Sequence, residues 1–172
     1  MPPGLDSCRS LLAYAGAGRE LLARLKYRNA RSAVAWLADG MAGLAEPDVV
    51  DTAVITWAPT TDERRRRRSF DQAEVLARAV AQRLGRPARP LLVRTGGGAS
   101  TGRSALERRA NAPCYTTRRH VPGAVILVDD VVTTGTTLMA AAVALRIAGT
   151  TRINALTAAR TPLKVISAGT DA

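Results

Sequence analysis

The stretch V-I-L-V-D-D-V-V-T-T-G-T-T, residues 125–137, decides the fold of this chain. The apolar run at 124–128, which overlaps its start, is rich in β-branched residues and is typical of a central parallel strand that is covered on both faces. Asp129 and Asp130 follow at the carboxyl end of that strand, which is where open α/β sheets bind their ligands. The stretch therefore predicts an α/β fold with a ligand site at this edge of the sheet.

The second half of the stretch is a turn rich in hydroxyl groups. Residues 133–137, T-T-G-T-T, offer successive backbone N–H groups just before an alanine-rich helix expected at 138–148. Such a turn at a helix N-terminus binds phosphate. An acid pair would repel a phosphate, so it is expected to hold a ribose diol, with Mg²⁺ bridging other oxygens. The residues predicted to bind a ribose 5-phosphate are Asp129, Asp130, Thr133, Thr134, Gly135, Thr136 and Thr137.

Two other interpretations fit parts of this stretch. The first is a buried strand, an acidic turn and a threonine-rich helix cap that bind no ligand. The second is a P-loop, which is disfavoured because the chain contains no G-x-x-x-x-G-K-[ST] pattern. The order of the parts favours the sugar-phosphate site over both.

These residues resemble the phosphoribosyl diphosphate (PRPP) signature of type I phosphoribosyltransferases. Further segments resemble landmarks of the ComF family, and together they cover about residues 14–161. These segments are K-Y at 26–27, R-S-F-D-Q at 68–72, T-G at 101–102, and E-R-R with a following asparagine at 107–111. The resemblance implies PRPP and Mg²⁺ as ligands, transfer of the phosphoribosyl group to an unidentified base or amine with release of diphosphate, and a link to competence for DNA uptake.

The length of 172 residues and a hydrophobic content of 47% fit a single domain. We expect a short leader at 1–13, the phosphoribosyltransferase-like domain at 14–166 and a tail at 167–172. The fold class is α/β, with a parallel sheet and helices on both faces. Helices are predicted at 19–27, 31–45, 70–84, 104–111 and 138–148, strands at 49–56, 90–94, 124–128 and 152–158, an extended piece at 114–117, and a mobile segment at 96–102.

A second part of the site is expected after the strand at 49–56. Ala58, Pro59, Thr60 and Thr61 would lie at the same sheet edge as the phosphate turn, and the resemblance makes this loop the diphosphate site. The ComF family commonly has V-P-V-P here, whereas this chain has T-W-A-P at 56–59. An ordinary loop between a strand and a helix is the alternative interpretation.

Several cations are candidates for contacts with an anionic ligand. Five arginines stand in a row at 64–68, and a helix or turn directs only about half of them at one ligand. The remainder of the row is expected to form a solvated charged face. Arg68 is favoured, as a catalytic residue with Asp129 and Asp130. The other predicted anion contacts are Arg66, Lys26, Arg103 and Arg108, and an exposed basic helix is the alternative for the last two.

The formal net charge is +11, and only Lys26 and Lys164 among the 25 basic residues are lysine. This points to a polyanionic ligand, although an arginine-rich genome would produce the same bias. The rival function is a PRPP-binding regulatory protein that contacts single-stranded DNA without turnover. Against it, aromatic residues make up only 3% of the chain, and single-strand binding usually relies on aromatic stacking.

The remaining expectations concern zinc, location and assembly. Cys8 and Cys114 form no C-x-x-C pair and His120 is the only histidine, so we expect no zinc and no counterpart of the zinc ribbon with which many ComF relatives begin. No apolar run has the length of a membrane span and the start of the chain lacks the pattern of a secretion signal, so a cytoplasmic protein is expected. The sequence does not fix the oligomeric state, and a dimer is one candidate.

Overall fold

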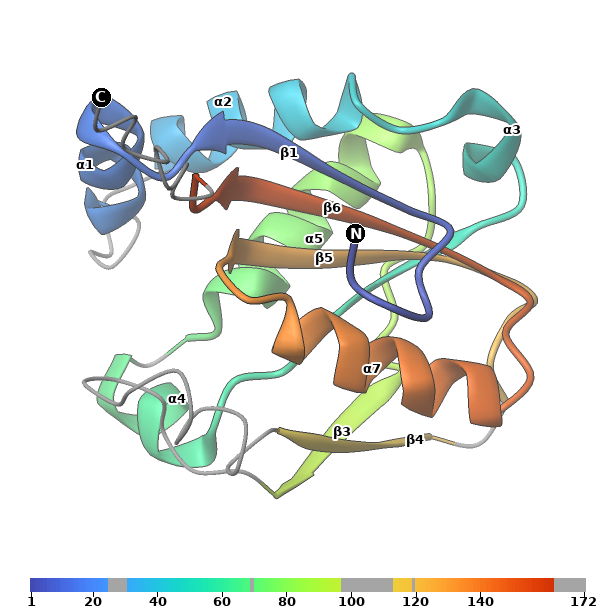
Figure 1. Cartoon of the computed structure of the whole chain (residues 1–172). Helices are drawn as coiled ribbons and strands as arrows, with labels where there is room; N and C mark the ends of the chain where they lie inside the picture. Colours follow the sequence, from blue (N-terminus) through green and yellow to red (C-terminus); the bar gives the residue numbers. More distant parts are fainter. Residues whose placement is uncertain (25–30, 69, 97–112, 119, 163–172) are drawn as a thin grey trace, which may run out of the picture.

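A parallel four-stranded sheet forms the centre of the protein (Figure 1). The computed structural model describes residues 1–24, 31–68, 70–96, 113–118 and 120–162. The strand order in the sheet is β1 (Ser7–Ala13), β6 (Arg152–Arg160), β5 (Ala124–Val132) and β2 (Val54–Trp57). A separate antiparallel pair consists of β3 (Leu92–Gly96) and β4 (Cys114–Thr117). The helices described are α1 (Gly16–Arg24), α2 (Arg31–Ala42), α3 (Pro47–Val50), α4 (Asp62–Arg68), α5 (Gln72–Leu84) and α7 (Thr136–Ile147).

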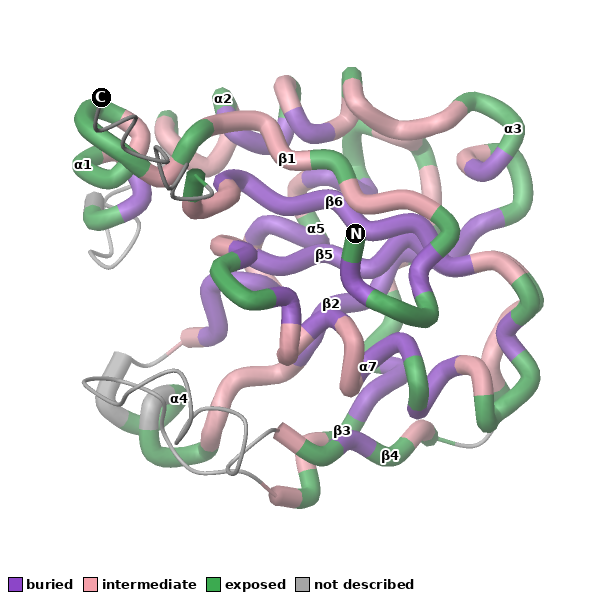
Figure 2. Tube along the Cα trace, in the orientation of Figure 1, coloured by how far each residue is buried: buried purple, intermediate pink, exposed green. Residues whose placement is uncertain are grey.

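The two faces of the sheet carry separate hydrophobic clusters. Successive side chains of a strand point to opposite faces. On β5, Ile126 and Val128 belong to the cluster that includes α2 and α5, while Val125 and Leu127 belong to the cluster beneath α7. Figure 2 shows this central region as buried along β5 and β6. The predicted parallel sheet with helices on both faces is therefore confirmed.

The start of the chain differs from the prediction. Residues 7–13, expected to belong to a leader outside the domain, form the edge strand β1, which pairs with β6 from Ser7–Asn154 to Ala13–Arg160. The sequence S-C-R-S-L-L-A contains no β-branched residue and no strict alternation, so it carries a weak strand signal. Pairing with the buried neighbouring strand β6 stabilises this strand, which its local sequence alone does not favour.

The strand expected at 49–56 is wrong in its first half. Residues 47–50 form the short helix α3, which begins with a proline in its first turn, a position that proline favours. Val49 is fully buried there, so its side chain serves helix packing rather than a sheet. The strand itself covers only Val54–Trp57.

Other boundaries are close to those predicted from the periodicity. Helix α5 begins after the N-cap Asp71 and ends at Gly85, which has a left-handed φ of 62°. Strand β5 continues four residues beyond its expected end at Val128, to Val132. Strands β3 and β4 stand apart from the parallel sheet and contact α7. The helix predicted at 104–111, most of the segment 96–102 and the tail lie outside the described residues.

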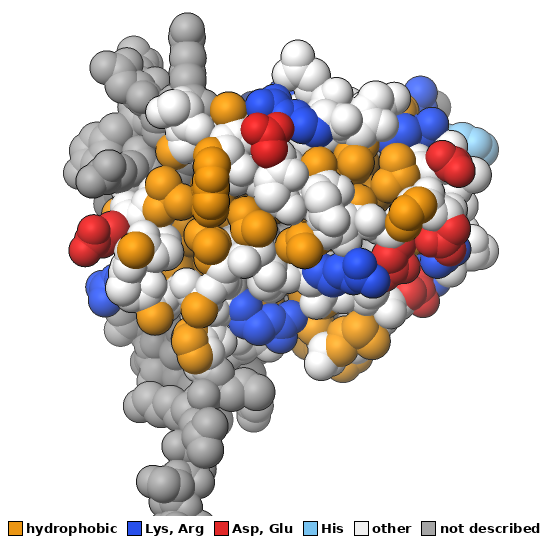
Figure 3. All heavy atoms as spheres, turned by 90° about the horizontal axis from the view of Figure 1, so that it is seen from above, with side chains coloured by type: hydrophobic (Ala, Val, Ile, Leu, Met, Phe, Trp, Pro, Cys, Tyr) orange, Lys and Arg blue, Asp and Glu red, His pale blue; other side chains and the backbone are white. Residues whose placement is uncertain are grey.

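The face seen from above combines hydrophobic and charged areas (Figure 3). Hydrophobic side chains gather over one part of it, and the side chain of Trp36 on α2 is 52% exposed. Charged side chains of both signs gather toward the α3 end, where Arg9 and Arg152 pair with Glu46. Among the residues that the structure describes, no helix is both long and apolar enough to span a bilayer.

Candidate functional site

The acid pair lies within the last part of β5. Asp129 is buried and stands beside Thr157 of β6, while Asp130 is half-buried. Each carboxylate accepts a hydrogen bond from the next backbone N–H: Asp130 N donates to Asp129 Oδ1 at 2.9 Å, and Val131 N donates to Asp130 Oδ1 at 2.7 Å. Among the described side chains, no arginine or lysine forms an ion pair with either acid. The two carboxylates therefore lie at the sheet edge without a positive partner from the described part of the chain.

The surroundings of Asp129 disfavour its charged form. Burial raises the pKa of its carboxyl well above the usual value, and the negative charge of Asp130 raises it further. The hydrogen bond from the Asp130 amide lowers the pKa but does not reverse the shift. A bound cation or a pair of donated hydroxyl hydrogen bonds would offset the cost of this charge.

The hydroxyl-rich turn, residues 133–137, follows β5 directly and leads into α7. Gly135 is the N-cap of α7, with a φ of 78°, and no side chain in the described part of the chain forms a capping hydrogen bond at this helix end. The hydroxyls of Thr134 and Thr136 lie 2.8 Å apart. A pocket of about 30 Å³ is lined by Asp129 and residues 131–138. The structure thus brings the turn and the first acid of the pair to one pocket, and among the described side chains none caps the first N–H groups of α7.

The predicted diphosphate loop, residues 58–61, lies beside the acid pair. Strand β2 pairs with β5 up to Trp57 and Val128, and Ala58 N donates to the Val128 carbonyl at 3.4 Å. The loop therefore leaves the sheet at the same edge as Asp129. Trp57, which stands where the ComF family commonly has the first proline, is 5% exposed and packs in the core, with the Arg78 guanidinium 5.3 Å from its ring.

Asp71 holds this loop and was not among the predicted site residues. Its Oδ2 accepts a hydrogen bond from Thr60 N at 2.8 Å, and its Oδ1 accepts one from Ala73 N at 3.1 Å as the N-cap of α5. Burial raises the pKa of Asp71 against the lowering effect of these hydrogen bonds. The aspartate just before a helical pattern is the sequence signal for the cap, but nothing local indicates the bond to Thr60.

Tyr115 is a second residue that the sequence analysis missed. It comes from β4, and its hydroxyl donates to the Pro59 carbonyl at 3.4 Å. Arg94 Nη1 donates to the same hydroxyl at 3.4 Å, and the guanidinium lies 5.8 Å from the ring centre. Burial raises the pKa of Tyr115, so the hydroxyl keeps its proton. The β3–β4 pair thus supports the loop from a distant part of the sequence, which no local pattern indicates.

The structure describes only some of the basic residues that were predicted to contact an anion. Helix α4 begins at Asp62, directly after the loop, and contains all five arginines of 64–68. It lies at the end of the molecule where β5 and β6 have their carboxyl ends (Figure 1). Arg66 is exposed and Arg65 lies 3.8 Å from Glu74. The side chain of Arg68 lies outside the described part of the structure, as do Lys26, Arg103 and Arg108.

Acidic groups at this edge suit a cation that also takes ligand oxygens. Within the described ranges no three histidine, cysteine or acidic side chains form a group that could enclose a metal ion. Asp129 and Asp130 supply hard carboxylate oxygens, the type that Mg²⁺ prefers, and a substrate and water would complete its coordination. Burial and the charge of Asp130 disfavour the charged form of Asp129, and a cation bound beside it would favour that form.

Comparisons with known proteins support the fold. No family model matches the sequence, and no curated protein matches it. A solved structure described as the allosteric regulatory enzyme of purine biosynthesis matches with a TM-score of 0.52 at 22% identity, over 79% of this chain. The chain spans only 30% of the length of that enzyme chain. The fold is phosphoribosyltransferase-like, with a parallel four-stranded sheet and flanking helices.

Proposed function

We propose that the protein binds PRPP together with Mg²⁺ and transfers its phosphoribosyl group to a base or amine, with release of diphosphate. One observation carries the proposal: the buried Asp129, for which the described side chains supply no basic partner, lines the same pocket as the N-terminus of α7, and the half-buried Asp130 follows it in β5. The acids favour positive charge and hydroxyl donors, whereas the helix end favours an anion. A sugar phosphate with a metal ion satisfies both requirements at once.

Each part of the site has a role in this proposal. Residues 133–137 bind the 5-phosphate through backbone N–H groups and hydroxyls. Asp129 and Asp130 accept hydrogen bonds from the ribose hydroxyls, and together with the substrate they would hold Mg²⁺, which supplies positive charge to the departing diphosphate. Residues 58–61 form the loop proposed to contact the diphosphate, although the amides of Ala58 and Thr60 already donate within the protein and Pro59 has no N–H. Asp71 and Tyr115 keep that loop in place through their bonds to Thr60 and Pro59.

The reaction needs little covalent chemistry from the protein. The bond between the anomeric carbon and the diphosphate oxygen breaks, the diphosphate leaves with the electron pair, and the acceptor nitrogen forms the new bond to that carbon. An acceptor N–H then loses its proton to the solvent. The chain's own residues bind and orient the ribose phosphate and place charge where the transition state develops it. Arg66 and Arg68 are the proposed cations near the diphosphate.

The proposal includes a role like that of ComF proteins, which are linked to competence for DNA uptake. The order of the sequence landmarks supports it, and a cytoplasmic location and a link to DNA uptake go with it. The net charge of +11 favours contact with single-stranded DNA as a second function. The low aromatic content weighs against such contact as the main function.

Titration calorimetry with PRPP in the presence and absence of Mg²⁺ tests the binding. We expect PRPP to bind with Mg²⁺ and to bind more weakly without it. Asp130→Asn should weaken binding, whereas Asp51→Asn, the same change at an exposed acid just after α3, should not. If PRPP does not bind, or if both variants bind as tightly as the unchanged protein, the proposed site is wrong.

Turnover needs a separate measurement. Diphosphate release from PRPP is followed across a panel of purines, pyrimidines and amines, with Asp130→Asn as the control for contaminating enzymes. Release that depends on one acceptor and is lost in the variant supports a transferase. PRPP binding without release above the variant's level for any acceptor would favour the regulatory alternative.

A further inference from the structure

The first six residues form a packed segment that reaches the hydroxyl-rich turn. We call residues 1–6 the strap. Pro2 is buried, and a Cβ atom built on Gly135 would lie only 2.6 Å from the Cγ atom of Pro2. Because Gly135 has no side chain, the proline ring rests directly against the backbone of the turn.

The strap follows one face of α7. A Cβ atom built on Gly4 would lie 3.4 Å from the Ala142 Cβ, and Arg146 Nε donates to the Gly4 carbonyl at 3.2 Å. Positions 135, 142 and 146 lie on one side of the helix because they are spaced by seven and four residues. Leu5 is 5% exposed and belongs to the hydrophobic cluster beneath α7. The strap therefore runs along the helix from its cap to its last turn.

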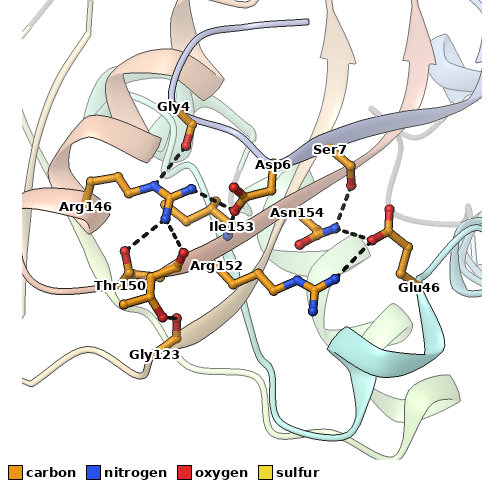
Figure 4. Close-up of polar contacts among 11 residues, drawn as sticks. Gly4, Asp6, Ser7, Glu46, Gly123, Arg146, Thr150, Arg152, Ile153 and Asn154 are labelled. Atoms are coloured by element: carbon orange, nitrogen blue, oxygen red, sulfur yellow. Dashed lines mark hydrogen bonds and ion pairs between the residues drawn. The ribbon is translucent and has the colours of Figure 1, made fainter.

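The far end of the strap is fixed to the sheet (Figure 4). Asp6 N donates to the Ile153 carbonyl at 2.9 Å, and Ile153 N donates to Asp6 Oδ2 at 2.6 Å. Arg146 Nη2 donates to the same carboxylate oxygen at 2.7 Å. These bonds join the strap to the start of β6 and to the last turn of α7. Pro2 is thus held at the turn by contacts more than one helix turn away.

The contact with Pro2 comes from outside the pocket. The pocket is lined by Asp129 and residues 131–138, and Pro2 is not among them. A glycine loses more backbone freedom on ordering than any other residue, so a turn that depends on Gly135 at a φ of 78° gains from external support. Ordering before the ligand arrives reduces the cost of binding.

We infer that Pro2 is a positioning residue, which holds Gly135 in its left-handed conformation and keeps the turn ready for an anionic group. The identity of that group as the 5-phosphate of PRPP rests on the proposed function. The role of Pro2 in ordering the turn does not. The strap as a whole ties the phosphate turn to the amino end of β6, so an element distant from the pocket contributes to affinity.

Two matched substitutions test the inference. Pro2→Gly removes the ring at the turn, whereas Pro3→Gly makes the same chemical change at the adjacent exposed position. Met139 N donates to the Gly135 carbonyl at 2.9 Å, so hydrogen exchange of the Met139 amide reports the order of the turn in the free protein. We expect exchange about tenfold faster in Pro2→Gly and little changed in Pro3→Gly. Calorimetry with PRPP and Mg²⁺ should show about tenfold weaker binding in Pro2→Gly only.

A second comparison keeps the test valid if Pro2→Gly does not fold. Pro2→Ala keeps the Cβ atom and removes the ring, and the same two measurements apply with Pro3→Ala as its control. Unchanged Met139 exchange and unchanged affinity in the folded Pro2 variant would overturn the inference. Tighter PRPP binding would also overturn it, because the strap would then obstruct the ligand. If the unchanged protein does not bind PRPP, the proposed function fails, while Met139 exchange still decides the role of Pro2.

Discussion

The acidic residues at the two ends of the parallel sheet differ in whether they form ion pairs with arginine. At the amino ends of β1 and β6, three acids each contact an arginine (Figure 4 shows part of this network). The pairs are Arg146 with Asp6 at 2.7 Å, Arg9 with Glu46 at 3.0 Å, and Arg152 with Asp48 at 2.7 Å. At the carboxyl ends, Asp71, Asp129 and Asp130 form no ion pair with any described side chain.

On the proposed function, Asp129 and Asp130 serve a ligand, whereas the acids at the amino ends serve the fold, as does Asp71 through its bonds to Thr60 and Ala73. Glu46 joins two arginines and the buried amide of Asn154, so its charge is balanced within the protein. Asp129 is buried, and the negative charge of Asp130 acts together with this burial to disfavour its ionisation. A buried charge without a partner costs stability, and such strain is expected where a binding site requires it.

The largest expected effect is that of a side chain at Gly135. Gly135→Val places a branched side chain at a φ of 78° and against Pro2, so binding of both PRPP and ribose 5-phosphate should fall by about 100-fold or more. Gly85→Val is the control, because Gly85 has a φ of 62° at the end of α5, with open space around it. It should lower stability and leave affinity per folded molecule unchanged. Retained ribose 5-phosphate binding in folded Gly135→Val would place the phosphate elsewhere.

Neutralising one acid at each end of the sheet tests whether acids at the carboxyl end serve binding while acids at the amino end serve stability. Asp130→Asn should weaken PRPP binding by about 1.5–3 kcal/mol, the range for a hydrogen bond to a charged group, with little loss of stability. Glu46→Gln should show the reverse: a loss of about 1–2 kcal/mol in unfolding free energy and unchanged PRPP affinity. Calorimetry and urea unfolding measure the two quantities. If both variants lose only stability, the acids at the two ends are equally structural.

The pH dependence of stability should also differ between the two ends. The folded-state pKa of Asp129 is raised, so the native protein binds this proton more tightly and its contribution to stability falls as pH rises above the unfolded pKa toward the folded one. The pKa of Asp48 is lowered by Arg152, so that contribution is present above the unfolded pKa and is lost as pH falls. Asp129→Asn should therefore remove the loss of stability that occurs as pH rises above the pKa of an unfolded aspartate. Asp48→Asn should remove the loss that occurs as pH falls below that pKa. Urea unfolding at several pH values measures both, and unchanged pH profiles would contradict the assignment.

The smallest individual effects are expected in the arginine row. If the row serves PRPP, alanine at Arg66 or Arg68 should reduce affinity while other positions of 64–68 remain near neutral. If all five follow a single strand, log affinity for single-stranded DNA should fall against log salt with a slope of about −3.5, and no single arginine should dominate. An alanine scan with both ligands measures this. Single-strand binding that survives physiological salt and disappears when all five are replaced would favour the nucleic-acid role.

The parts of the fold that could be predicted are those with a local signal. The apolar run before Asp129, the glycine turn at Gly135 and the periodicity of α5 each identify their element because neighbouring residues determine it. Strand β1 and helix α3 were missed because pairing with β6 and burial of Val49 decide them, and both contacts are distant in sequence.

The same distinction applies to the site. The acid pair and the turn are contiguous in the chain, so their order revealed a pocket. The supports of the site are Asp71 beneath Thr60, Tyr115 beneath Pro59 and Pro2 against Gly135, and the last two pairs are more than 50 residues apart. Each of these contacts depends on the tertiary structure, so no spacing rule could have identified it.

The most direct test of the central claim is thermal unfolding with and without PRPP and Mg²⁺. Ligand at about 100 times its dissociation constant should add about 2.7 kcal/mol to the unfolding free energy. For a chain of this size, the melting temperature should rise by about 5–10 °C. Asp130→Asn at the same ligand concentration should show a clearly smaller rise, and Glu46→Gln should show the full rise from a lower starting point. No rise with millimolar PRPP and Mg²⁺ would contradict the assignment of the carboxyl end as a PRPP site.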